Sequence, residues 1–241
     1  MKFADQGIII SILSYGENSA IVKLFSQDHG VYRGFVKSTK SAKSKAIFQV
    51  GNLISFEYKS RLEENLGQLS RCDLVKSYCT KILFEKDKLK IASSILRLID
   101  KAILEKLVLE ELFLLLSEFL QNLVDENEIN ENLKNYIILE FNILRNLGYE
   151  IDISSCVATG VTHNLKYVSP KSARAVCFES GKPYENKMLK LPGFLLNNAS
   201  LATRQDIKDG LELTSHFLLK FIFDGDVSKM DLRGDLNKLL L

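Results

Sequence analysis

The sequence predicts an α+β protein in which a five-stranded barrel of the OB-fold type precedes an α-helical domain with a loop-rich insert. Three observations support this prediction. Short apolar runs alternate with turn residues through residues 1–81. The hydrophobic repeat then changes to the period of a helix. Periodicity is lost again over residues 151–200, a segment that holds all three prolines of the chain.

Five strands are predicted in the barrel, and turn signals at 14–18 and 27–30 separate the first three of them. The expected strands are 7–13, 20–25, 30–36, 53–59 and 66–78. In the fourth strand Ile54, Phe56 and Tyr58 alternate with polar residues, as in a strand with one buried face. About five strands in about 80 residues suit a small closed barrel such as the OB-fold.

Helical spacing of apolar residues begins after Ile82 and returns after the insert. The apolar stripes are Leu89, Ala92, Ile95, Leu96 and Ile99, then Leu112, Leu115, Leu116 and Phe119, then Leu133, Ile137, Phe141 and Leu144. Gly148 is placed to end the third helix in the left-handed conformation, and Thr203 is placed to cap the last one. The expected segments are an OB-fold that binds nucleic acid (1–81), a first helical part (82–150), the insert (151–200) and a second helical part with a short tail (201–241).

Charge is distributed unevenly along the chain. The first 81 residues have 12 basic against 7 acidic residues, and residues 82–153 have 8 against 14. Residues 154–200 are basic again, with 6 against 2. Two basic parts therefore lie on either side of an acidic helical part, whose carboxylates are expected on solvated outer faces.

The first basic part contains a stretch without acidic residues, between Asp28 and Glu57. Such a ridge binds polyanions by releasing their condensed counterions, without base-specific geometry. Its candidate contact residues are Arg33, Lys37, Lys40, Lys43 and Lys45. The alternative is that Lys37 to Lys45 form only a solvated hairpin loop.

Aromatic residues next to these cations favour nucleic acid as the polyanion, since barrel grooves combine basic charge with rings on which bases stack. Tyr32, beside Arg33, is the expected stacking residue. Phe35 and Phe48 are expected in the core instead.

Cysteine spacing argues against a metal site. Cys156 and Cys177 each lack the second cysteine of a Cys-x-x-Cys pair, and Thr159 and Ser180 stand in its place. A closed structural zinc site needs four good ligands, so no metal and no other cofactor is expected. The two cysteines are expected to be buried packing residues.

Catalysis, secretion and membrane insertion find no support in the sequence. No nucleophile, phosphate-loop or metalloprotease motif is present. No apolar segment of signal-peptide length begins the chain. The most apolar run, 107–124, contains three carboxylates. We therefore expect a cytoplasmic protein that is not an enzyme.

Short motifs follow one another in a fixed order along the chain. They are Ser14-Tyr-Gly-Glu-Asn18, Phe25-Ser-Gln-Asp-His-Gly30, Gly34 with the Lys-Ser loop through Lys45, Leu139-Glu-Phe-Asn-Ile-Leu-Arg-Asn-Leu-Gly-Tyr149, Cys156-x-x-x-Gly160, Tyr167-Val-Ser-Pro-Lys-Ser172 and Ala175-Val-Cys177. Their order and spacing resemble the RecO family of bacterial recombination mediators over nearly the whole chain.

The resemblance implies an N-terminal OB-fold, a helical domain and a zinc-finger-like insert that holds metal only in members with all four cysteines. It implies binding of single- and double-stranded DNA, annealing of complementary strands, and help in loading RecA onto DNA covered by single-strand-binding protein (SSB). RecR and the acidic C-terminal tail of SSB are the implied partners. No reaction is catalysed in this role.

On this basis, the five cations of the acid-free stretch are the expected DNA contacts. Lys171 and Arg174, in the second basic part, are secondary candidates that extend the basic track or form only a solvated turn. Three other classes of function stay open. They are an RNA-binding OB-fold factor of the translation apparatus, a structural adaptor without nucleic-acid contacts, and a metal-dependent enzyme.

Overall fold

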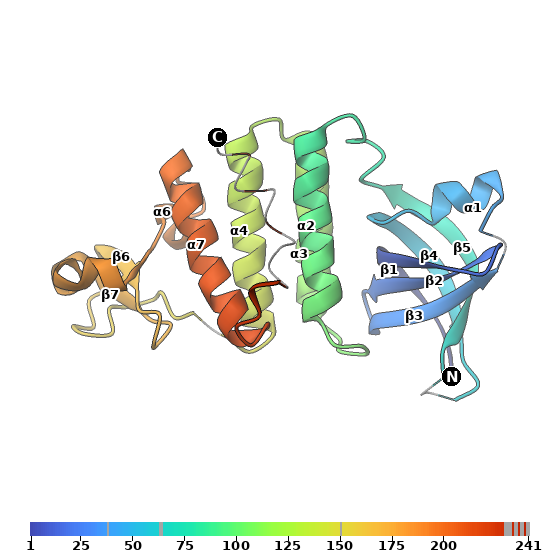
Figure 1. Cartoon of the computed structure of the whole chain (residues 1–241), viewed down its shortest axis with the longest axis horizontal. Coiled ribbons are helices and arrows are strands. Elements are labelled where there is room, and N and C mark those ends of the chain that lie inside the picture. The colour runs from blue at the N-terminus through green and yellow to red at the C-terminus, as the bar shows by residue number, and fades with distance from the viewer. Residues whose placement is uncertain are drawn as a thin grey trace. The chain divides into compact units, whose positions relative to one another are not determined.

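The computed structural model of the chain describes residues 1–37, 39–62, 65–149 and 151–228, together with Arg233, Leu236 and Leu239 (Figure 1). Most of the tail expected at 229–241 therefore lies outside the described residues. The chain divides into two compact units, Met1–Asp125 and Glu126–Leu241. Among the described residues, no helix has both the length and the apolar character that crossing a membrane requires.

The first unit begins with a closed five-stranded barrel, which confirms the predicted OB-type fold. The strands are β1 (Lys2–Tyr15), β2 (Ser19–Ser26), β3 (Gly30–Lys37), β4 (Asn52–Lys59) and β5 (Gly67–Ser77). Their order around the barrel is β1-β2-β3-β5-β4, and a parallel β3–β5 pair closes it. All five predicted strands are present, and β1 is longer than predicted.

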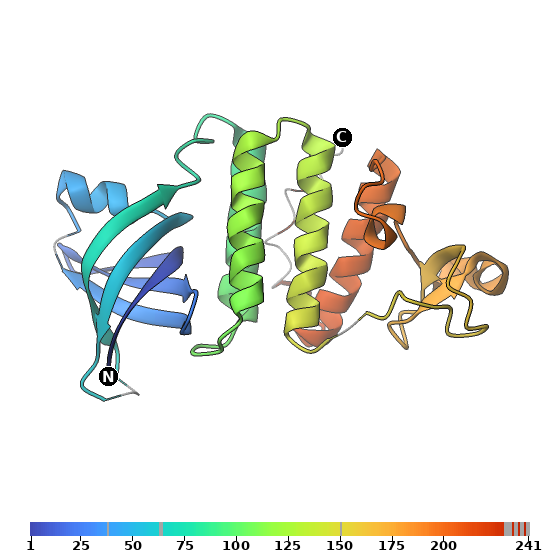
Figure 2. The same cartoon turned by 180° about the vertical axis from the view of Figure 1, so that it is seen from behind.

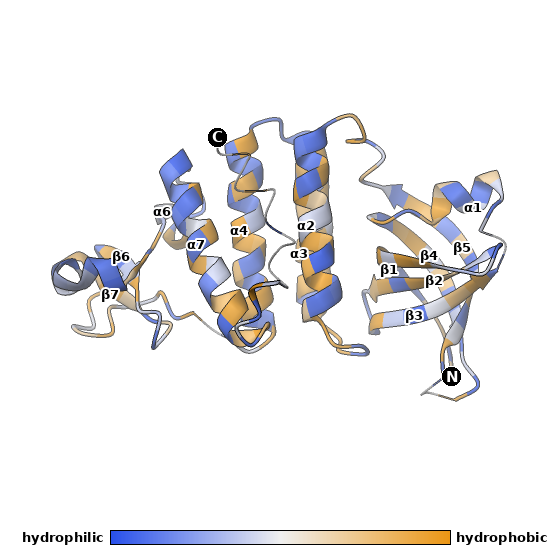
Figure 3. Ribbon diagram, viewed as in Figure 1, coloured by the Kyte–Doolittle hydropathy of each residue, from blue (hydrophilic) through white to orange (hydrophobic). Residues whose placement is uncertain are grey.

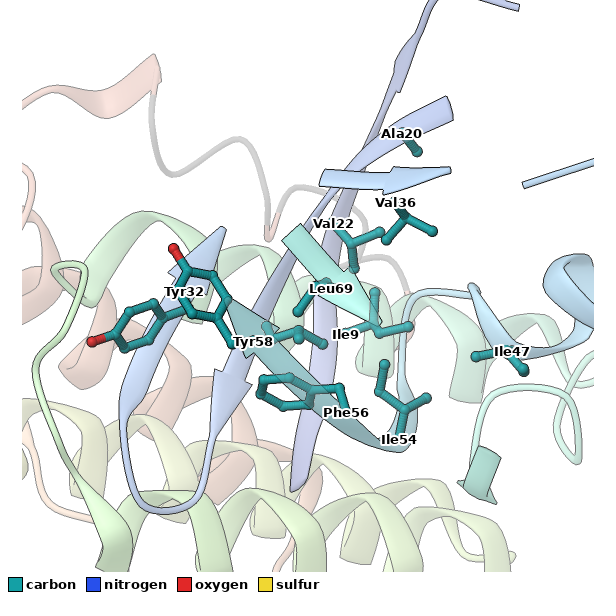
Figure 4. Packing of buried hydrophobic residues seen from close by; sticks show 11 residues of the cluster. Ile9, Ala20, Val22, Tyr32, Val36, Ile47, Ile54, Phe56, Tyr58 and Leu69 are labelled. Carbon is teal, nitrogen blue, oxygen red and sulfur yellow. The ribbon is translucent and has the colours of Figure 1, made fainter. Parts of the chain in front are cut away.

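Inward-facing residues from all five strands fill the barrel, as Figure 4 shows for its core cluster. Closure brings β3 close to β5, and a glycine on each of these strands makes room for a neighbouring side chain. A Cβ atom added at Gly34 would overlap the Leu69 side chain, and one added at Gly67 would overlap the Tyr58 ring. Gly34 therefore permits the close approach of β3 to β5, and Gly67 leaves room for the Tyr58 ring of β4.

A short helix, α1 (Ala42–Ile47), lies between β3 and β4, where the sequence predicted only a loop. Ser41 caps it, because its hydroxyl accepts a hydrogen bond from the backbone N–H of Ser44. Ile47 is buried in the barrel core. The Asn52 amide donates to two carbonyls at the end of the helix, each at 2.9 Å. The lysine-rich segment is therefore attached to the barrel at the C-terminal end of this helix.

Two helices complete the first unit, α2 (Lys86–Ala102) and α3 (Glu110–Asp125). Their buried residues follow the predicted apolar stripes. The segment between them runs beside the start of β3, where the backbone N–H of Lys106 donates to the carbonyl of Val31 at 2.8 Å. This contact places Glu105 next to the barrel.

In the second unit, α4 (Ile129–Asn146) and α7 (Arg204–Phe221) lie side by side in both views (Figures 1 and 2). Polar and apolar stretches alternate along both helices (Figure 3). The predicted ends are confirmed. Gly148, just beyond α4, has a φ of +85°, and Thr203 forms a capping box with Asp206 at the start of α7.

The insert between α4 and α7 consists of short elements joined by loops, as predicted. They are β6 (Leu165–Val168), β7 (Ala175–Cys177), α5 (Phe178–Gly181), the 3-10 helix η1 (Lys182–Lys187), β8 (Leu189–Lys190) and α6 (Gly193–Leu196). The three strands form one small sheet in the order β7-β6-β8.

Candidate nucleic-acid interface

Alternation along β3 places the candidates Arg33 and Lys37, together with Phe35, on the outer face of the barrel. Arg33 and Lys37 are exposed and Phe35 is half-buried, whereas the residues between them are buried. Since side chains along a strand alternate between its two faces, these three residues form one line. At about 3.3 Å per residue, the line from Arg33 to Lys37 is about 13 Å long.

Strands β2 and β1 extend this outer surface, because residues directly opposite each other on paired strands share a face. The rows that cross β3, β2 and β1 are Lys37–Ser19–Tyr15, Phe35–Ile21–Leu13 and Arg33–Lys23–Ser11. We call these nine residues the β1–β3 face. The Tyr15 ring is 60% exposed and packs edge-to-face against Phe35, with 5.8 Å between ring centroids. The face therefore presents two aromatic rings beside Lys37.

Further lysines follow directly after β3. Lys40 is exposed in the connecting turn, and Lys43 and Lys45 lie on α1. Lys43 Nζ pairs with Asp73 Oδ1 at 3.1 Å, but both side chains are well exposed, so the pair adds little stability. Lys37 and Lys43 line one hollow of about 320 Å³ between the end of β3, α1 and β5. Lys45 is not in that lining, since residues two apart on a helix do not share a face.

The cations at the two ends of the β1–β3 face differ in whether they form ion pairs. At one end, Arg33 forms an ion pair with Glu105, and Lys23 Nζ lies 2.8 Å from Asp100 Oδ1. At the other end, Lys37 is exposed and forms no ion pair with another described residue, and the same holds for Lys40 and Lys45. Phosphates that bind at the Lys37 end therefore compete with fewer protein carboxylates for the cations than phosphates at the Arg33 end do.

The structure corrects the expected stacking residue. Tyr32 is only 6% exposed and lies inside the barrel, with its ring centroid 5.1 Å from that of Tyr58. Phe35 faces outward instead, while Phe48 packs partly buried against the core as expected. The signal was present in the alternation, because Phe35 is in phase with the charged Arg33 and Tyr32 is not.

The secondary candidates belong to the second unit. Lys171 is exposed in the turn between β6 and β7, and its carbonyl accepts a hydrogen bond from Lys220 Nζ at 3.1 Å. Arg174 Nε lies 3.2 Å from Asp152 Oδ2. Hydrogen bonds from Ser154, more than the contact with Arg174, lower the pKa of Asp152. That Lys171 and Arg174 contact DNA stays a prediction.

Thr159 and Ser180, which stand where a Cys-x-x-Cys pair would have its second cysteine, both lie close to Cys177. Thr159 Oγ1 lies 3.7 Å from Cys177 Sγ, and Cys177 Sγ lies 3.5 Å from Ser180 Oγ. Zinc with Zn–S bonds of about 2.3 Å holds tetrahedral ligands roughly 3.8 Å apart, which matches these spacings. Three of the four positions therefore lie close together, two of them as hydroxyls, and we call the residues Cys156, Thr159, Cys177 and Ser180 the insert knuckle.

The donor set of this knuckle does not fit structural zinc, which takes thiolate or imidazole ligands at all four positions. Within the described residues, no cluster of three or more His, Cys, Asp or Glu side chains is arranged to hold a metal. Hydrogen bonds link Thr159, Cys177 and Ser180 to one another. Burial raises the pKa of Cys156, but hydrogen bonds from the Thr159 hydroxyl and from the backbone outweigh it and bring the pKa to about 6.

Changing Thr159→Cys together with Ser180→Cys is expected to create a zinc site, because the two hydroxyls already stand at ligand spacing. Elemental analysis of the purified variant should give about one zinc per chain, and the unchanged protein should give none. The single Thr159→Cys variant serves as the control and should hold metal weakly. Stoichiometric zinc in the unchanged protein would contradict this reading of the knuckle.

Comparison with known proteins covers both units. The family model described as Recombination protein O N terminal matches residues 1–78, and the one described as Recombination protein O C terminal matches residues 84–226. The chain is 39% identical over 223 residues to proteins named DNA repair protein RecO from Rickettsia typhi, Rickettsia akari and Rickettsia peacockii. Each alignment covers 92% of this chain and 92% of the relative.

Proposed function

Since the chain belongs to the RecO family of DNA repair proteins, we propose that it binds single- and double-stranded DNA through the β1–β3 face and the lysines that follow it. The observation that carries this proposal is the position of Tyr15 and Phe35 beside Lys37. Cations bind phosphates by counterion release, and exposed rings stack on the bases of an unpaired strand.

The proposed activity is annealing of complementary strands. Two phosphate backbones repel each other as they approach, and a basic surface between them lowers this repulsion. The rings can hold the bases of one strand unstacked until the second strand pairs with them. This role needs positioning and charge but no chemical step, so we propose that the protein is not an enzyme.

We further propose that the protein acts as a recombination mediator in the bacterial cytoplasm. In this role it works with RecR, contacts the acidic tail of SSB, and helps RecA to load onto SSB-coated DNA. The support is family membership over both units. Because such a tail is acidic, its contact is expected to weaken as salt rises.

Competition binding tests whether the protein prefers DNA or RNA. Labelled single-stranded DNA bound to the protein is challenged with unlabelled DNA or RNA of matched sequence and length. Phosphate contacts and stacking are open to both polymers, so the proposal, which takes DNA from family membership, predicts that DNA displaces the label at lower concentration than RNA. Preferential displacement by RNA would favour an RNA-binding factor of the translation apparatus, and no binding at low salt would favour an adaptor.

Changing Phe35→Ala together with Tyr15→Ala is expected to weaken binding of single-stranded DNA by about 1–3 kcal/mol per lost stacked base. Duplex binding should change little, because the bases of a duplex already stack on each other. Fluorescence anisotropy with matched single-stranded and duplex DNA measures both affinities. Leu13→Ala is the control, since Leu13 shares the row of Phe35 but has no ring. Equal losses for the two DNA forms would contradict stacking.

A further inference from the structure

A small pocket of about 190 Å³ opens at the Arg33 end of the β1–β3 face. Strands β2 and β3 contribute Ile21, Tyr32 and Arg33, and β4 contributes Tyr58. The loop between β4 and β5 adds Asn65 and Leu66. Pockets for drug-sized ligands are usually about 300–1,000 Å³, so this one has room for a single ring system.

Two buried tyrosines make the inner wall of this pocket. Tyr32 and Tyr58 are 6% and 3% exposed, and Figure 4 shows their hydroxyls together on one side, away from the aliphatic core. The Tyr58 hydroxyl accepts a hydrogen bond from the backbone N–H of Gly67 at 3.0 Å, which fixes the ring. Burial is the main cause that raises the pKa of Tyr58, so its hydroxyl stays neutral. The wall is therefore rigid, aromatic and uncharged.

The outer wall of the pocket is polar and carries two cations, Arg33 and Lys106, and one carboxylate, Glu105. Arg33 and Glu105 both line it and form an ion pair with each other. The Asn65 side-chain amide is a donor and an acceptor on the same lining. A phosphate gains little from a guanidinium already neutralised by a carboxylate. The aromatic, uncharged inner wall suits a neutral planar group with polar edges, such as a nucleobase.

The pocket is continuous with the β1–β3 face. Ile21 lines the pocket and also lies opposite Phe35 in the middle row of that face. Arg33 is two residues from Phe35, or about 7 Å along the strand. A DNA strand that stacks on Phe35 and contacts Lys37 can therefore reach the pocket. The strand β2–β3 surface and the β4–β5 loop are also the parts with which OB-folds bind oligonucleotides.

We propose that this pocket holds one unstacked base of a DNA strand bound on the β1–β3 face. The inference rests on the proposed DNA binding and adds a base site to it. Tyr32 and Tyr58 form the apolar wall against the base, and Asn65 with the Arg33–Glu105 pair meets its polar edge. Such a base is held out of the stack and is kept from pairing within its own strand.

Photo-crosslinking tests this inference with the full chain. Single-stranded DNA that carries 5-iodouracil at one position is bound at low salt and irradiated, and the crosslinked peptides are identified. The variant Asn65→Trp fills the pocket with an indole, while the backbone groups of residue 65 keep their hydrogen bonds. Leu66→Trp repeats the test should the first variant fail to fold. Leu62→Trp is the matched control, because Leu62 is exposed in the same loop but does not line the pocket.

The unchanged protein should crosslink through Tyr32 or Tyr58, and filling the pocket should lower this yield about tenfold, the scale of one lost stacked base. Leu62→Trp should leave the yield and the DNA affinity unchanged, and the pocket-filling variants should keep the slope of log K against log salt, because their phosphate contacts are intact. Crosslinks only through Tyr15 or Phe35, no crosslink from bound DNA, or a yield that survives pocket filling would overturn the base site. Absence of DNA binding by the unchanged protein would overturn the proposed function itself.

Discussion

Changing Lys37, Lys40, Lys43 and Lys45 to alanine together is expected to weaken DNA binding strongly and to flatten its dependence on salt. Each phosphate contact releases condensed counterions, and its loss lowers the slope of log K against log salt by roughly 0.7 for single strands and 0.9 for duplexes. Loss of up to four contacts therefore lowers the slope for single strands by up to about 3. Affinities measured between roughly 50 and 200 mM salt give both slopes.

A control variant that loses the same number of positive charges elsewhere distinguishes the loss of DNA contacts from the loss of net charge. Changing Lys81, Lys86, Lys90 and Lys101 to alanine removes the same charge from residues just before or on α2. That variant should keep most of the affinity and nearly the whole slope, because net charge acts at long range and is screened. If the first variant folds and keeps the slope of the unchanged protein, those four lysines do not contact DNA.

Changing Arg233→Met is expected to lower the free energy of unfolding by about 3–5 kcal/mol, because it leaves a buried carboxylate unpaired. Glu140 on α4 is fully buried. Its Oε2 atom accepts hydrogen bonds from Arg233 Nη2 and from Thr214 Oγ1, each at 2.7 Å. Denaturant unfolding measures the change. A loss below about 1 kcal/mol would show that Arg233 does not neutralise Glu140 in solution.

The pH dependence of this variant follows from the direction of the shift. Burial raises the pKa of Glu140, and Arg233 opposes that shift, so removing Arg233 raises the pKa further. A folded state with a raised carboxyl pKa binds its proton more tightly than the unfolded chain does. Stability contributed by this group is therefore full below the ordinary pKa near 4.5 and is lost as pH rises toward the folded pKa. The loss is at most about 1.4 kcal/mol per pH unit.

The double change Glu140→Leu with Arg233→Met is the matched control. It removes both buried charges, and replacing a buried ion pair by apolar residues is often neutral or stabilising. Thr214 Oγ1 keeps a hydrogen bond to the Gly210 carbonyl at 3.1 Å. The double variant should recover most of the stability lost in Arg233→Met and should lack its dependence on pH.

The barrel could be predicted because its signals are local. The turn at Ser14–Asn18 and the alternation at Ile54, Phe56 and Tyr58 each concern a few neighbouring residues. Helix α1 escaped prediction because six residues are too few for a periodic pattern and the lysines dominated the segment. Tyr15 was assigned to a turn, although β1 continues through it.

Long-range pairings could not be predicted from one sequence. Acidic residues of the helices were expected on solvated faces, yet Glu140 is buried because Arg233, 93 positions later, neutralises it. Likewise, no local signal indicates that Glu105, from the segment after α2, forms an ion pair with Arg33. The inner position of Tyr32 was predictable from the alternation of β3, and proximity to Arg33 alone gave the wrong stacking residue.

Annealing of SSB-coated complementary strands by the purified protein tests the central claim most directly. One strand carries a fluorophore and the other a quencher, so pairing is read as loss of fluorescence. The unchanged protein should accelerate annealing, and the change of Lys37, Lys40, Lys43 and Lys45 to alanine should abolish the acceleration, while the α2 control keeps it. No acceleration by the unchanged protein, at salt concentrations where it binds both strands, would contradict the proposed function.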